Sequence, residues 1–600
     1  MSDPRLVRGI GVSPGVAIGR AVVLRLTLPE LPGRVVARKD VPREVRRLRD
    51  GVRAVRRYLE RMRERAARRA GAEEAKIFDA QILMLEDADF LGGVEALIRG
   101  NQLSAERAFE FRALETRNLW QANPRLREQV SDLSGLHFRV LQYLLGQPVD
   151  SMPEGIGGGQ PAVVFTHELT PGLTVQFDRA HIAAFASEEG TRTAHAAILA
   201  HSLGIPCVMG LVGSLERVRD GTTVILDGTH GTVLLDPTPE EITAAKAQDK
   251  RRLALEHELE KVVGQPAVSR DGEHVILRGN VDMPDELEAA AQHGAEGVGL
   301  VRTEFMILGR TELPDEDEQT AYYTRIGERF PGHPVVVRSY DVGGDKFPAA
   351  FAPQPEANPF LGWRALRVCL DRPEIFRTQI RAVLRARATG DVQLMIPLVT
   401  NMEEITRTRE LIAEAARDLE REGCAAAREL PLGVMVETPA AVVMIDAIAE
   451  ASDFLSVGTN DLTQYTLVVD RGNARLAERF TPLNPAIVRM LRTIVDAARA
   501  AGKEVSVCGE MASEPVTAFL LLGLGYRVLS TSSPRLPLVR WLVRQIDVAA
   551  AARAAEAALR ARTNRDVRVL LEDALAQHVD LRLLEGGRLP PSRSATSFKA

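Results

Sequence analysis

The second half of the chain repeats one pattern, a short apolar run followed by a helical segment, eight times. The runs are 275–281, 297–302, 335–340, 394–399, 433–437, 454–461, 505–510 and 528–532. Apolar runs of this length between helical segments are typical of buried parallel strands. Eight strand–helix repeats are what a (β/α)8 TIM barrel requires, so we predict one over residues 265–575. A doubly wound open sheet is the competing fold.

The runs 433–437 and 454–461, which are consecutive along the chain, each end in a carboxylate. Glu437 closes the run that starts at Gly433, and Asp461 follows Val457 in Val-Gly-Thr-Asn-Asp. Carboxylates at the mouths of neighbouring strands suit a hard divalent cation such as Mg²⁺, which takes one or two protein carboxylates and leaves its other positions to water and substrate. Each carboxylate could instead cap the helix that follows its strand. Their joint occurrence beside arginines favours the metal.

Arginines gather at the same predicted mouth. They are Arg302, Arg338, Arg364 and Arg471. Arginine binds phosphate and carboxylate groups with two parallel hydrogen bonds, so the cavity is expected to take a highly charged anion. Arginines together with Mg²⁺ are the usual means of stabilising a transferring phosphoryl group. Cys508 lies at this mouth as a weak acid suited to giving a proton to carbon, although a small buried core residue is the alternative.

The first half has a different organisation. Strand-like runs occupy 8–24 and return between 161 and 237, whereas 41–146 is helical and charged. This pattern predicts an α/β domain interrupted by a helical insertion. The arginine-rich run 43–69 is interleaved with glutamates, which is typical of a solvated helix. We expect an α/β domain over 1–40 and 147–238, a helical subdomain over 41–146, a linker helix over 239–264 and a flexible tail over 576–600.

A histidine stands at a predicted helix start in this half. A turn at Gly190 leads to Thr193, a candidate N-cap, and the following helix ends near Gly204 and Pro206. His195 therefore lies in the first helical turn, where backbone N–H groups and the helix dipole favour a phosphate. A neutral imidazole can attack phosphorus and form a covalent intermediate. A histidine packed beside a cap is the alternative, since the chain has 11 histidines.

Composition excludes several classes of protein. No run of about 18 apolar residues occurs, so no membrane span is predicted. The N-terminus lacks an apolar signal core, which predicts a cytoplasmic protein. A formal net charge of −5 gives no reason to expect nucleic acid as a partner. The four cysteines have no paired spacing, which argues against disulfides and a zinc site.

The motifs of the barrel half, taken together, resemble a known family. They are 296–305 (Glu-Gly-Val-Gly-Leu-Val-Arg-Thr-Glu-Phe), 341–346, 358–364, the Glu437 run, 458–466 and 470–473, with 11–17 near the N-terminus. The chain resembles the Enzyme I family of the bacterial phosphoenolpyruvate:sugar phosphotransferase system from Gly11 to about Arg544. It is more distantly similar to pyruvate phosphate dikinase and phosphoenolpyruvate synthase.

The resemblance implies a role for each candidate residue. His195 accepts the phosphoryl group on Nε2, and Thr170 hydrogen-bonds that histidine and orients it. Phosphoenolpyruvate is held by a set of residues at the barrel mouth, namely Arg302, Arg338, Arg364, Arg471 and Asn460. Mg²⁺ is bound by Glu437 and Asp461, and Cys508 protonates the enolate to give pyruvate.

The resemblance also implies an architecture and partners. The N-terminal α/β domain swivels and carries phosphohistidine from the barrel to the carrier protein HPr, which docks on the helical subdomain. The family works as a homodimer through the barrel. The first step of sugar uptake is therefore the expected function, and ATP is not expected as a substrate.

Departures from the family pattern lie in the N-terminal half. Thr191 replaces a glycine, Ala194 a serine, and Gln81 a histidine, while His201 and Gln129 stand where arginines are usual. These changes leave open two other interpretations. One is a phosphoenolpyruvate-binding regulatory homologue that transfers phosphate weakly or to another partner. The other is an enzyme that interconverts phosphoenolpyruvate and pyruvate with a separate nucleotide-binding protein.

Overall fold

The chain divides into two compact units, one ending at Leu253 and the other spanning Ala254–Leu584. The computed structural model describes residues 3–24, 31, 35–69, 71–122, 130–149, 161–176, 181–190, 195–284, 286–307, 310, 312–343, 356, 358–471, 473, 476 and 479–584, without the side chains of 72, 73, 122, 131, 176 and 195. Within these residues no helix is both long and apolar enough to cross a membrane.

The first unit is built on an eight-stranded sheet. Its spatial order is β1-β8-β7-β3-β4-β5-β6-β2 within the described chain. The strands are β1 (Leu6–Arg8), β2 (Ile10–Ser13), β3 (Val16–Leu24), β4 (Ala162–Thr166), β5 (Ile182–Ser187), β6 (Cys207–Met209), β7 (Thr223–Asp227) and β8 (Thr232–Leu235). Strands β3 to β6 run parallel, and the remaining pairs are antiparallel. Phe165 and Phe185 belong to two separate apolar cores, so both faces of the sheet are covered.

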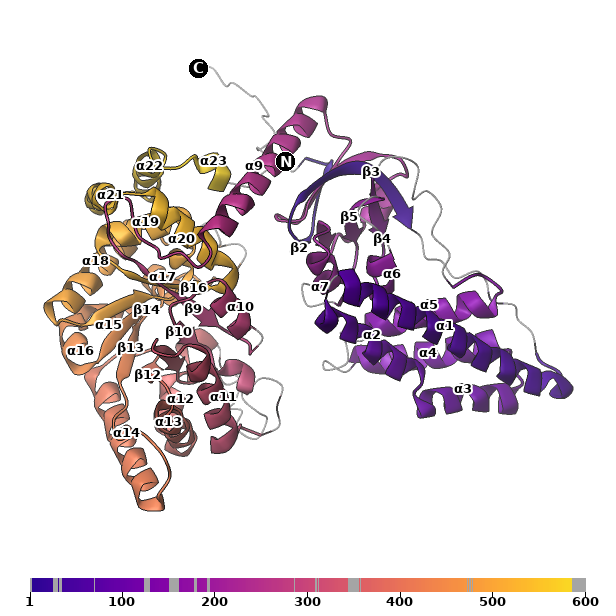
Figure 1. Ribbon diagram of the computed structural model, residues 1–600, viewed down its shortest axis with the longest axis horizontal. Coiled ribbons are helices and arrows are strands. Elements are labelled where there is room, and N and C mark those ends of the chain that lie inside the picture. Colours follow the sequence, from indigo (N-terminus) through magenta and orange to yellow (C-terminus); the bar gives the residue numbers. More distant parts are fainter. Residues whose placement is uncertain are drawn as a thin grey trace. The chain divides into compact units, whose positions relative to one another are not determined.

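A helical bundle is inserted between β3 and β4, as the sequence predicts (Figure 1). Its elements are η1 (Arg38–Asp40), α1 (Val41–Arg69), α2 (Ala72–Leu85), α3 (Ala88–Asn101), α4 (Ala105–Ala122) and α5 (Val130–Leu144). The arginine-rich run forms α1, whose apolar stripe, including Val55 and Tyr58, faces the bundle core. Its arginines pair along the surface, for example Arg56 Nε with Glu60 Oε1 at 3.2 Å, as expected for a solvated helix face.

Short helices join this bundle to the sheet. They are α6 (Pro171–Gln176), α7 (His195–Ser202) and α8 (Ser214–Arg217). Ala196 and Ala200 of α7 pack in a core beneath the sheet, whereas Leu199 packs in the core of the bundle. Ser202 Oγ also donates a hydrogen bond to Glu74 Oε1 of α2 at 2.9 Å. Helix α7 is therefore fixed between the two halves of this unit. The chain then leaves along the predicted linker helix, α9 (Pro239–Val262).

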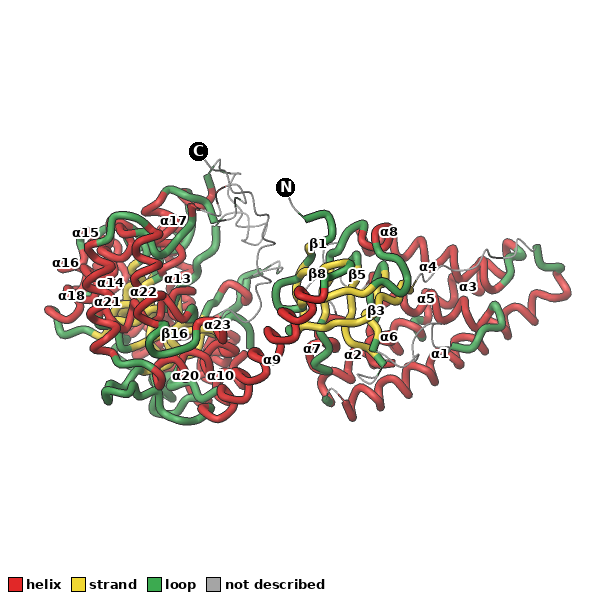
Figure 2. Tube along the Cα trace, turned by 90° about the horizontal axis from the view of Figure 1, so that it is seen from above, coloured by secondary structure: helices red, strands yellow, loops and turns green. Residues whose placement is uncertain are grey.

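The second unit is a closed barrel of eight parallel strands, which confirms the predicted fold. The strands are β9 (Ile276–Val281), β10 (Val298–Val301), β11 (Val335–Arg338), β12 (Val392–Ile396), β13 (Leu432–Val436), β14 (Phe454–Val457), β15 (Glu504–Val507) and β16 (Val528–Ser532). Figure 2 shows these strands, in yellow, enclosed by red helices. Covered on both faces, the strands are apolar along almost their whole length.

The enclosing helices follow the strands in order. They are α10 (Glu286–Gln292), η3 (Glu304–Met306), α11 (Glu316–Arg329), η5 (Pro359–Leu361), α12 (Leu366–Asp371), α13 (Pro373–Arg387), α14 (Met402–Glu422), α15 (Pro439–Val443), α16 (Ile445–Ala451), α17 (Thr459–Leu467), α18 (Pro485–Ala500), η7 (Glu510–Ala512), α19 (Pro515–Leu524), η8 (Ser533–Arg535), α20 (Leu536–Gln545), α21 (Val548–Arg560), α22 (Asn564–Leu575) and α23 (Leu581–Leu584). Their inner faces and the strands form one large core.

Two boundaries differ from the sequence prediction. The run expected as a strand over 454–461 ends at Val457, and Thr459 already begins α17. The chain is also folded beyond the expected start of the tail at 576. Val579 is buried in the barrel core, and α23 follows it, because apolar side chains continue past α22. The remainder of the expected tail, 585–600, lies outside the described residues.

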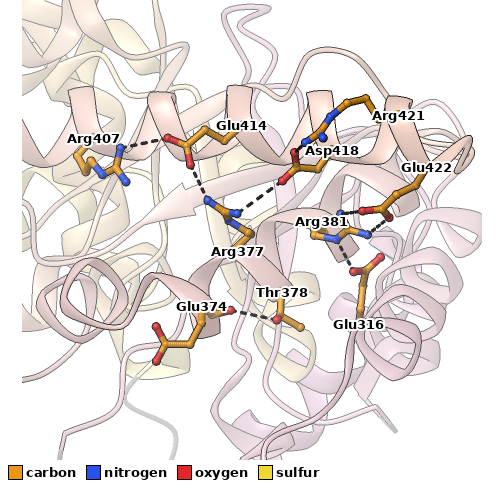
Figure 3. Close-up of polar contacts among 10 residues, drawn as sticks. All are labelled: Glu316, Glu374, Arg377, Thr378, Arg381, Arg407, Glu414, Asp418, Arg421 and Glu422. Atoms are coloured by element: carbon orange, nitrogen blue, oxygen red, sulfur yellow. Dashed lines mark hydrogen bonds and ion pairs between the residues drawn. The ribbon is translucent and has the colours of Figure 1, made fainter.

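An ion-pair network covers part of the barrel exterior (Figure 3). Arg381 of α13 contacts Glu316 of α11 and Glu422 of α14. Arg377, one turn earlier, lies 2.6 Å from Glu414 of α14. A single exposed pair contributes little to stability, but this network links three outer helices, α11, α13 and α14. It stiffens the wall of the barrel away from the strand ends.

Candidate active site

A cavity of about 700 Å³ opens at the carboxyl ends of the barrel strands. It brings together every barrel residue to which the sequence assigned a role: Arg302, Arg338, Arg364, Glu437, Asn460, Asp461, Arg471 and Cys508. Arg302, Glu437 and Cys508 each directly follow a strand, and Arg338 ends one. Because parallel strands of a barrel all end at one face, residues far apart in sequence meet there.

The carboxylates of Glu437 and Asp461 form the candidate metal site. Glu437 is buried, and its Oε1 accepts a hydrogen bond from the backbone N–H of Leu398 at 2.7 Å. Glu437 Oε2 and Asp461 Oδ1 are buried without a hydrogen-bond partner in the described chain. Burial and the neighbouring carboxylates of Asp461 and Asp341 raise the pKa of Glu437 well above its ordinary value. Two unpartnered carboxylate oxygens in one buried site fit a divalent cation.

No larger set of ligands surrounds this pair. The described residues contain no group of three or more histidine, cysteine and acidic side chains arranged to hold a metal. A cation at Glu437 and Asp461 would therefore take its remaining positions from water or from substrate oxygens, as Mg²⁺ commonly does. The backbone also limits the site, because a Cβ on Gly458 would lie 2.5 Å from Glu437 Oε2.

Two arginines are held in place by buried acids. Arg338 Nη2 donates to Glu304 Oε1 at 2.6 Å, and Arg364 Nη2 donates to Asp341 Oδ1 at 2.8 Å. Burial opposes the charge on Arg338, but Glu304 and Asp341 keep its pKa above the ordinary value. The Nε atoms of both arginines are buried and have no acceptor among the described residues. The guanidinium groups are thus oriented in advance, with donors still available for an anion.

The other side of the cavity is less buried. Arg302 Nη1 pairs with Asp282. Asn460 Nδ2 donates to Glu510 Oε1 at 3.3 Å, while Asn460 Oδ1 accepts from the backbone N–H of Glu510 at the same distance. Arg471, from the loop after α17, is exposed. These groups give the mouth polar donors that can move to meet a ligand.

The setting of Cys508 is compatible with both alternatives that the sequence left open. Its side chain is buried with Leu300 and Met435 in the small apolar core inside the barrel, and all three also line the cavity. The thiol Sγ lies 3.7 Å from the carbonyl oxygen of Val457. Burial raises the pKa of the Cys508 thiol, so the group keeps its proton at neutral pH. It is therefore a neutral acid at the floor of the site.

Several lining residues were not among the predicted site residues. Asp341, Glu304 and Glu510 also follow strands, so the sequence alone places them at the same mouth, although it assigned them no role. In the structure they orient arginine and asparagine side chains. Asp282, which pairs with Arg302, directly follows β9 and so carried the same positional signal. Phe360 belongs to η5, and the centroid of its ring lies 5.4 Å from Cζ of Arg364.

The predicted histidine site lies in the first unit. Helix α7 begins at His195, as expected, although the side chain of His195 and residues 191–194, including Thr191, Thr193 and Ala194, lie outside the described residues. Thr170 precedes α6, where its Oγ1 accepts a hydrogen bond from the N–H of Leu173 at 3.4 Å. Thr170 also lines a second cavity, between the bundle and the sheet.

The sequence departures have separate structural settings. Gln81 is buried on α2, and its Nε2 donates to Asp132 Oδ1 of α5 at 2.7 Å, so it joins two helices of the bundle. His201 is exposed in the last turn of α7. Gln129 lies outside the described residues. Gln81 therefore has a packing role in this chain.

Comparisons with known proteins agree with this organisation. Family models match at 8–128 (PEP-utilising enzyme, N-terminal), 158–231 (PEP-utilising enzyme, mobile domain) and 256–548 (PEP-utilising enzyme, PEP-binding domain). The phosphoenolpyruvate-protein phosphotransferase of Geobacillus stearothermophilus is 38% identical over 565 residues, covering 94% of this chain and 97% of that protein. That of Bacillus subtilis (strain 168) is 37% identical over 529 residues, covering 88% and 92%.

A solved solution structure of an Enzyme I (nEIt) protein is also similar, with 27% identity, a TM-score of 0.33, and coverage of 41% of this chain and 98% of that one. The sequence relatives, rather than this structural likeness, establish the relationship, since they extend over nearly the whole chain. The chain belongs to the phosphoenolpyruvate-protein phosphotransferase family of PEP-utilising enzymes.

Proposed function

We propose that this protein transfers the phosphoryl group of phosphoenolpyruvate to its own His195, releasing pyruvate, and then to a histidine of HPr or an HPr-like carrier. The observation that supports this most is the convergence of two carboxylates, four arginines and a buried thiol on one cavity. Phosphoenolpyruvate carries a phosphate and a carboxylate, and paired guanidinium groups recognise both. The thiol serves a reaction that ends by protonating a carbon.

The residues divide the chemistry among themselves. Arg338 and Arg364 hold the substrate anion, assisted by Arg302, Arg471 and Asn460. Mg²⁺, held by Glu437 and Asp461, would supply positive charge beside the transferring phosphoryl group. The bond between phosphorus and the enol oxygen breaks while a bond from His195 Nε2 to phosphorus forms. The enolate then takes the Cys508 proton on carbon, which gives pyruvate.

The second half-reaction needs a partner protein. HPr or an HPr-like carrier would dock on the helical bundle, α1–α5, and receive the phosphoryl group from His195. Movement of the N-terminal α/β domain would bring His195 to each site in turn, with Thr170 orienting the imidazole. A homodimer through the barrel and a cytoplasmic location complete the proposal, and all of these features come from the family resemblance.

The decisive experiment is peptide mass spectrometry of the purified protein after incubation with phosphoenolpyruvate and Mg²⁺. We expect an acid-labile phosphoryl group on the His195 peptide, formed with one equivalent of pyruvate and absent from His195→Ala. His257→Ala, which changes an exposed histidine on α9, serves as the matched control and should be phosphorylated normally. Phosphate on another residue, or none despite binding of phosphoenolpyruvate, would refute the proposal.

A further inference from the structure

The second cavity has a volume of about 210 Å³ and lies wholly within the first unit. It is enclosed by α4 and α5 of the bundle and by the segment joining β4 to α6. Its polar lining is Arg117, Ser134, His137, Arg139, Thr166, His167, Glu168 and Thr170. A water molecule occupies roughly 30 Å³ of liquid, so the space holds several waters or one small oxyanion.

Two nitrogen atoms from different helices are left without partners at this cavity. Arg117 Nε of α4 and His137 Nε2 of α5 are both buried, and neither has a hydrogen-bond partner in the described chain. A buried polar group without a hydrogen-bond partner costs about 1–3 kcal/mol, so two at one cavity require an explanation. Burial and then the charge of Arg117 lower the pKa of His137 to about 4.

Other groups define what could satisfy these atoms. The Thr170 hydroxyl accepts a hydrogen bond from Leu173 N–H, and its own proton is not used in any hydrogen bond among the described residues. Ser134, by contrast, already donates to the carbonyl of Val130 at 3.0 Å. A permanent cation, a hydroxyl donor and an imidazole together complement a ligand rich in acceptor oxygens. Glu168 also lines the space, which disfavours more than one anionic group.

We propose that this cavity binds a single phosphoryl-type dianion, held by Arg117 and His137 and contacted by the hydroxyl of Thr170. This inference deepens the proposed function, in which Thr170 orients the phosphorylated histidine. The same chemistry can come from two sources, either a phosphoryl group carried on His195 or free inorganic phosphate. In both cases Arg117 and His137 act as positioning residues that this chain supplies from α4 and α5.

The direct test follows the imidazole of His137 by NMR in histidine-labelled full-length protein, with His137→Gln used to assign the signal. The probe is inorganic phosphate, added to the unphosphorylated protein. An anion beside His137 favours the imidazolium, so bound phosphate should raise the pKa of His137. Loss of one charge-assisted hydrogen bond should weaken phosphate binding by roughly tenfold or more in Arg117→Gln.

Arg112→Gln is the matched control. Arg112 lies on the same helix, but its Nη1 pairs with Glu115 at 2.6 Å outside the cavity. This variant should bind phosphate like the unmodified protein. Circular dichroism of both variants verifies that α4 is retained. If Arg117 has only a structural role, phosphate will leave the pKa of His137 unchanged in every variant.

Two further arms identify the source of the anion. If His195→Ala still shifts the His137 signal with free phosphate, the cavity accepts phosphate on its own. If only protein phosphorylated by phosphoenolpyruvate shows the shift, and Arg117→Gln shortens the lifetime of its phosphohistidine at least threefold, the carried group is the ligand. If the His137 signal shifts in neither arm, the inference is overturned. Phosphate binding in a protein that never phosphorylates His195 would refute the proposed function alone.

Discussion

Arg338 Nη1 lies 2.9 Å from Asp341 Oδ2, and less than a tenth of each side chain is exposed. A buried pair of this kind fixes a cation where substrate can reach it, because the acid orients the guanidinium before any ligand arrives. Asp341 also accepts a hydrogen bond from Arg364, so one carboxylate orients two arginines. Burial opposes this charge, but Arg338 and Arg364 hold the pKa of Asp341 below its ordinary value.

Removing the Asp341 carboxylate tests how strongly folding stability and substrate binding depend on it. In Asp341→Asn two buried guanidinium groups lose a counter-ion, so the free energy of unfolding should fall by about 3 kcal/mol. An anionic substrate can replace the lost charge. Phosphoenolpyruvate should therefore raise the melting temperature of Asp341→Asn by more than it raises that of the unmodified protein. Asp391→Asn, an exposed carboxylate paired with Arg387, is the control. Equal ligand-induced shifts in all three proteins would contradict the argument.

The metal site makes a separate prediction. Glu437→Gln and Asp461→Asn should each abolish Mg²⁺-dependent pyruvate formation, because each removes one of the two carboxylates proposed to hold the cation. Calorimetric titration with Mg²⁺ and phosphoenolpyruvate measures the lost binding. Glu422→Gln, on the barrel exterior in the network of Figure 3, should retain full activity. Retention of activity in either site variant would remove that residue from the metal site.

Metal affinity should depend on pH through Glu437. Because the pKa of Glu437 is raised, the metal-free protein holds a proton there at pH values where an exposed glutamate is ionised. A divalent cation must displace this proton, so its apparent affinity should rise as pH increases toward the pKa of Glu437 and then level off. The stability of the metal-free fold should change with pH in the opposite direction. Metal-free stability should decline as pH rises through that pKa, since the ionised form is disfavoured in the folded state. Titrations in buffers of different ionisation enthalpy would count the released protons; none released would exclude this coupling.

Cys508→Ala should separate binding from proton transfer. The thiol faces the cavity and is itself uncharged, so phosphoenolpyruvate affinity should change less than threefold. Pyruvate release should slow by roughly 100-fold or more, the usual contribution of a positioned general acid. Cys369→Ala is matched because Cys369 is equally buried in the outer barrel core and does not line the cavity. Comparable effects of both substitutions would indicate packing alone.

Asp271 joins the beginning of the barrel to its end. Its carboxylate accepts hydrogen bonds from the N–H groups of Val548, at 3.0 Å, and Ala549, at 2.9 Å, at the start of α21. Asp271→Asn should lower stability by about 1 kcal/mol, as loss of a helix cap does. Burial opposes ionisation, but hydrogen bonds from Ser269, Ala549 and Val548 lower the pKa of Asp271 to about 2. This contribution is therefore present above pH about 3.8 and is lost as pH falls toward 2. Urea titrations at pH 7 and pH 2.5 would test both statements, and a variant deficit that persists unchanged at pH 2.5 would contradict the second.

The barrel was predictable because its sequence signal is repeated. Each buried strand is an apolar run, and a polar residue directly after it must lie at the shared mouth; this rule alone places Arg302, Glu437 and Cys508. The rule has limits at strand ends. The expected strand run extends over residues 458–461, but the chain turns into α17 at Thr459, so Asn460 and Asp461 lie in the first turn of a helix rather than at the end of a strand.

The remaining features depend on contacts between distant segments. Asp282 and Arg302 each directly follow a strand, so the rule places both at the mouth, but it does not indicate that they pair; the adjacency of β9 and β10 creates the pairing. The cavity beside Thr170 is likewise invisible in the sequence, since Arg117 and His137 belong to helices whose packing against the β4–α6 segment is a tertiary property. Helical periodicity predicts which face of α5 is buried. It does not predict which atoms of other segments lie against that face.

Gly458 and Gly509 border the carboxylate site so closely that an added methyl group would collide with Glu437 and Thr459, respectively. This close packing limits which amino acids these two positions can accept. In a saturation library of the barrel mouth, selection for growth that depends on the enzyme should remove every non-glycine codon at these two positions. Codons for exposed neighbouring residues such as Val468 should vary freely. These two positions of the cavity wall should therefore stay glycine even where the surrounding loops change.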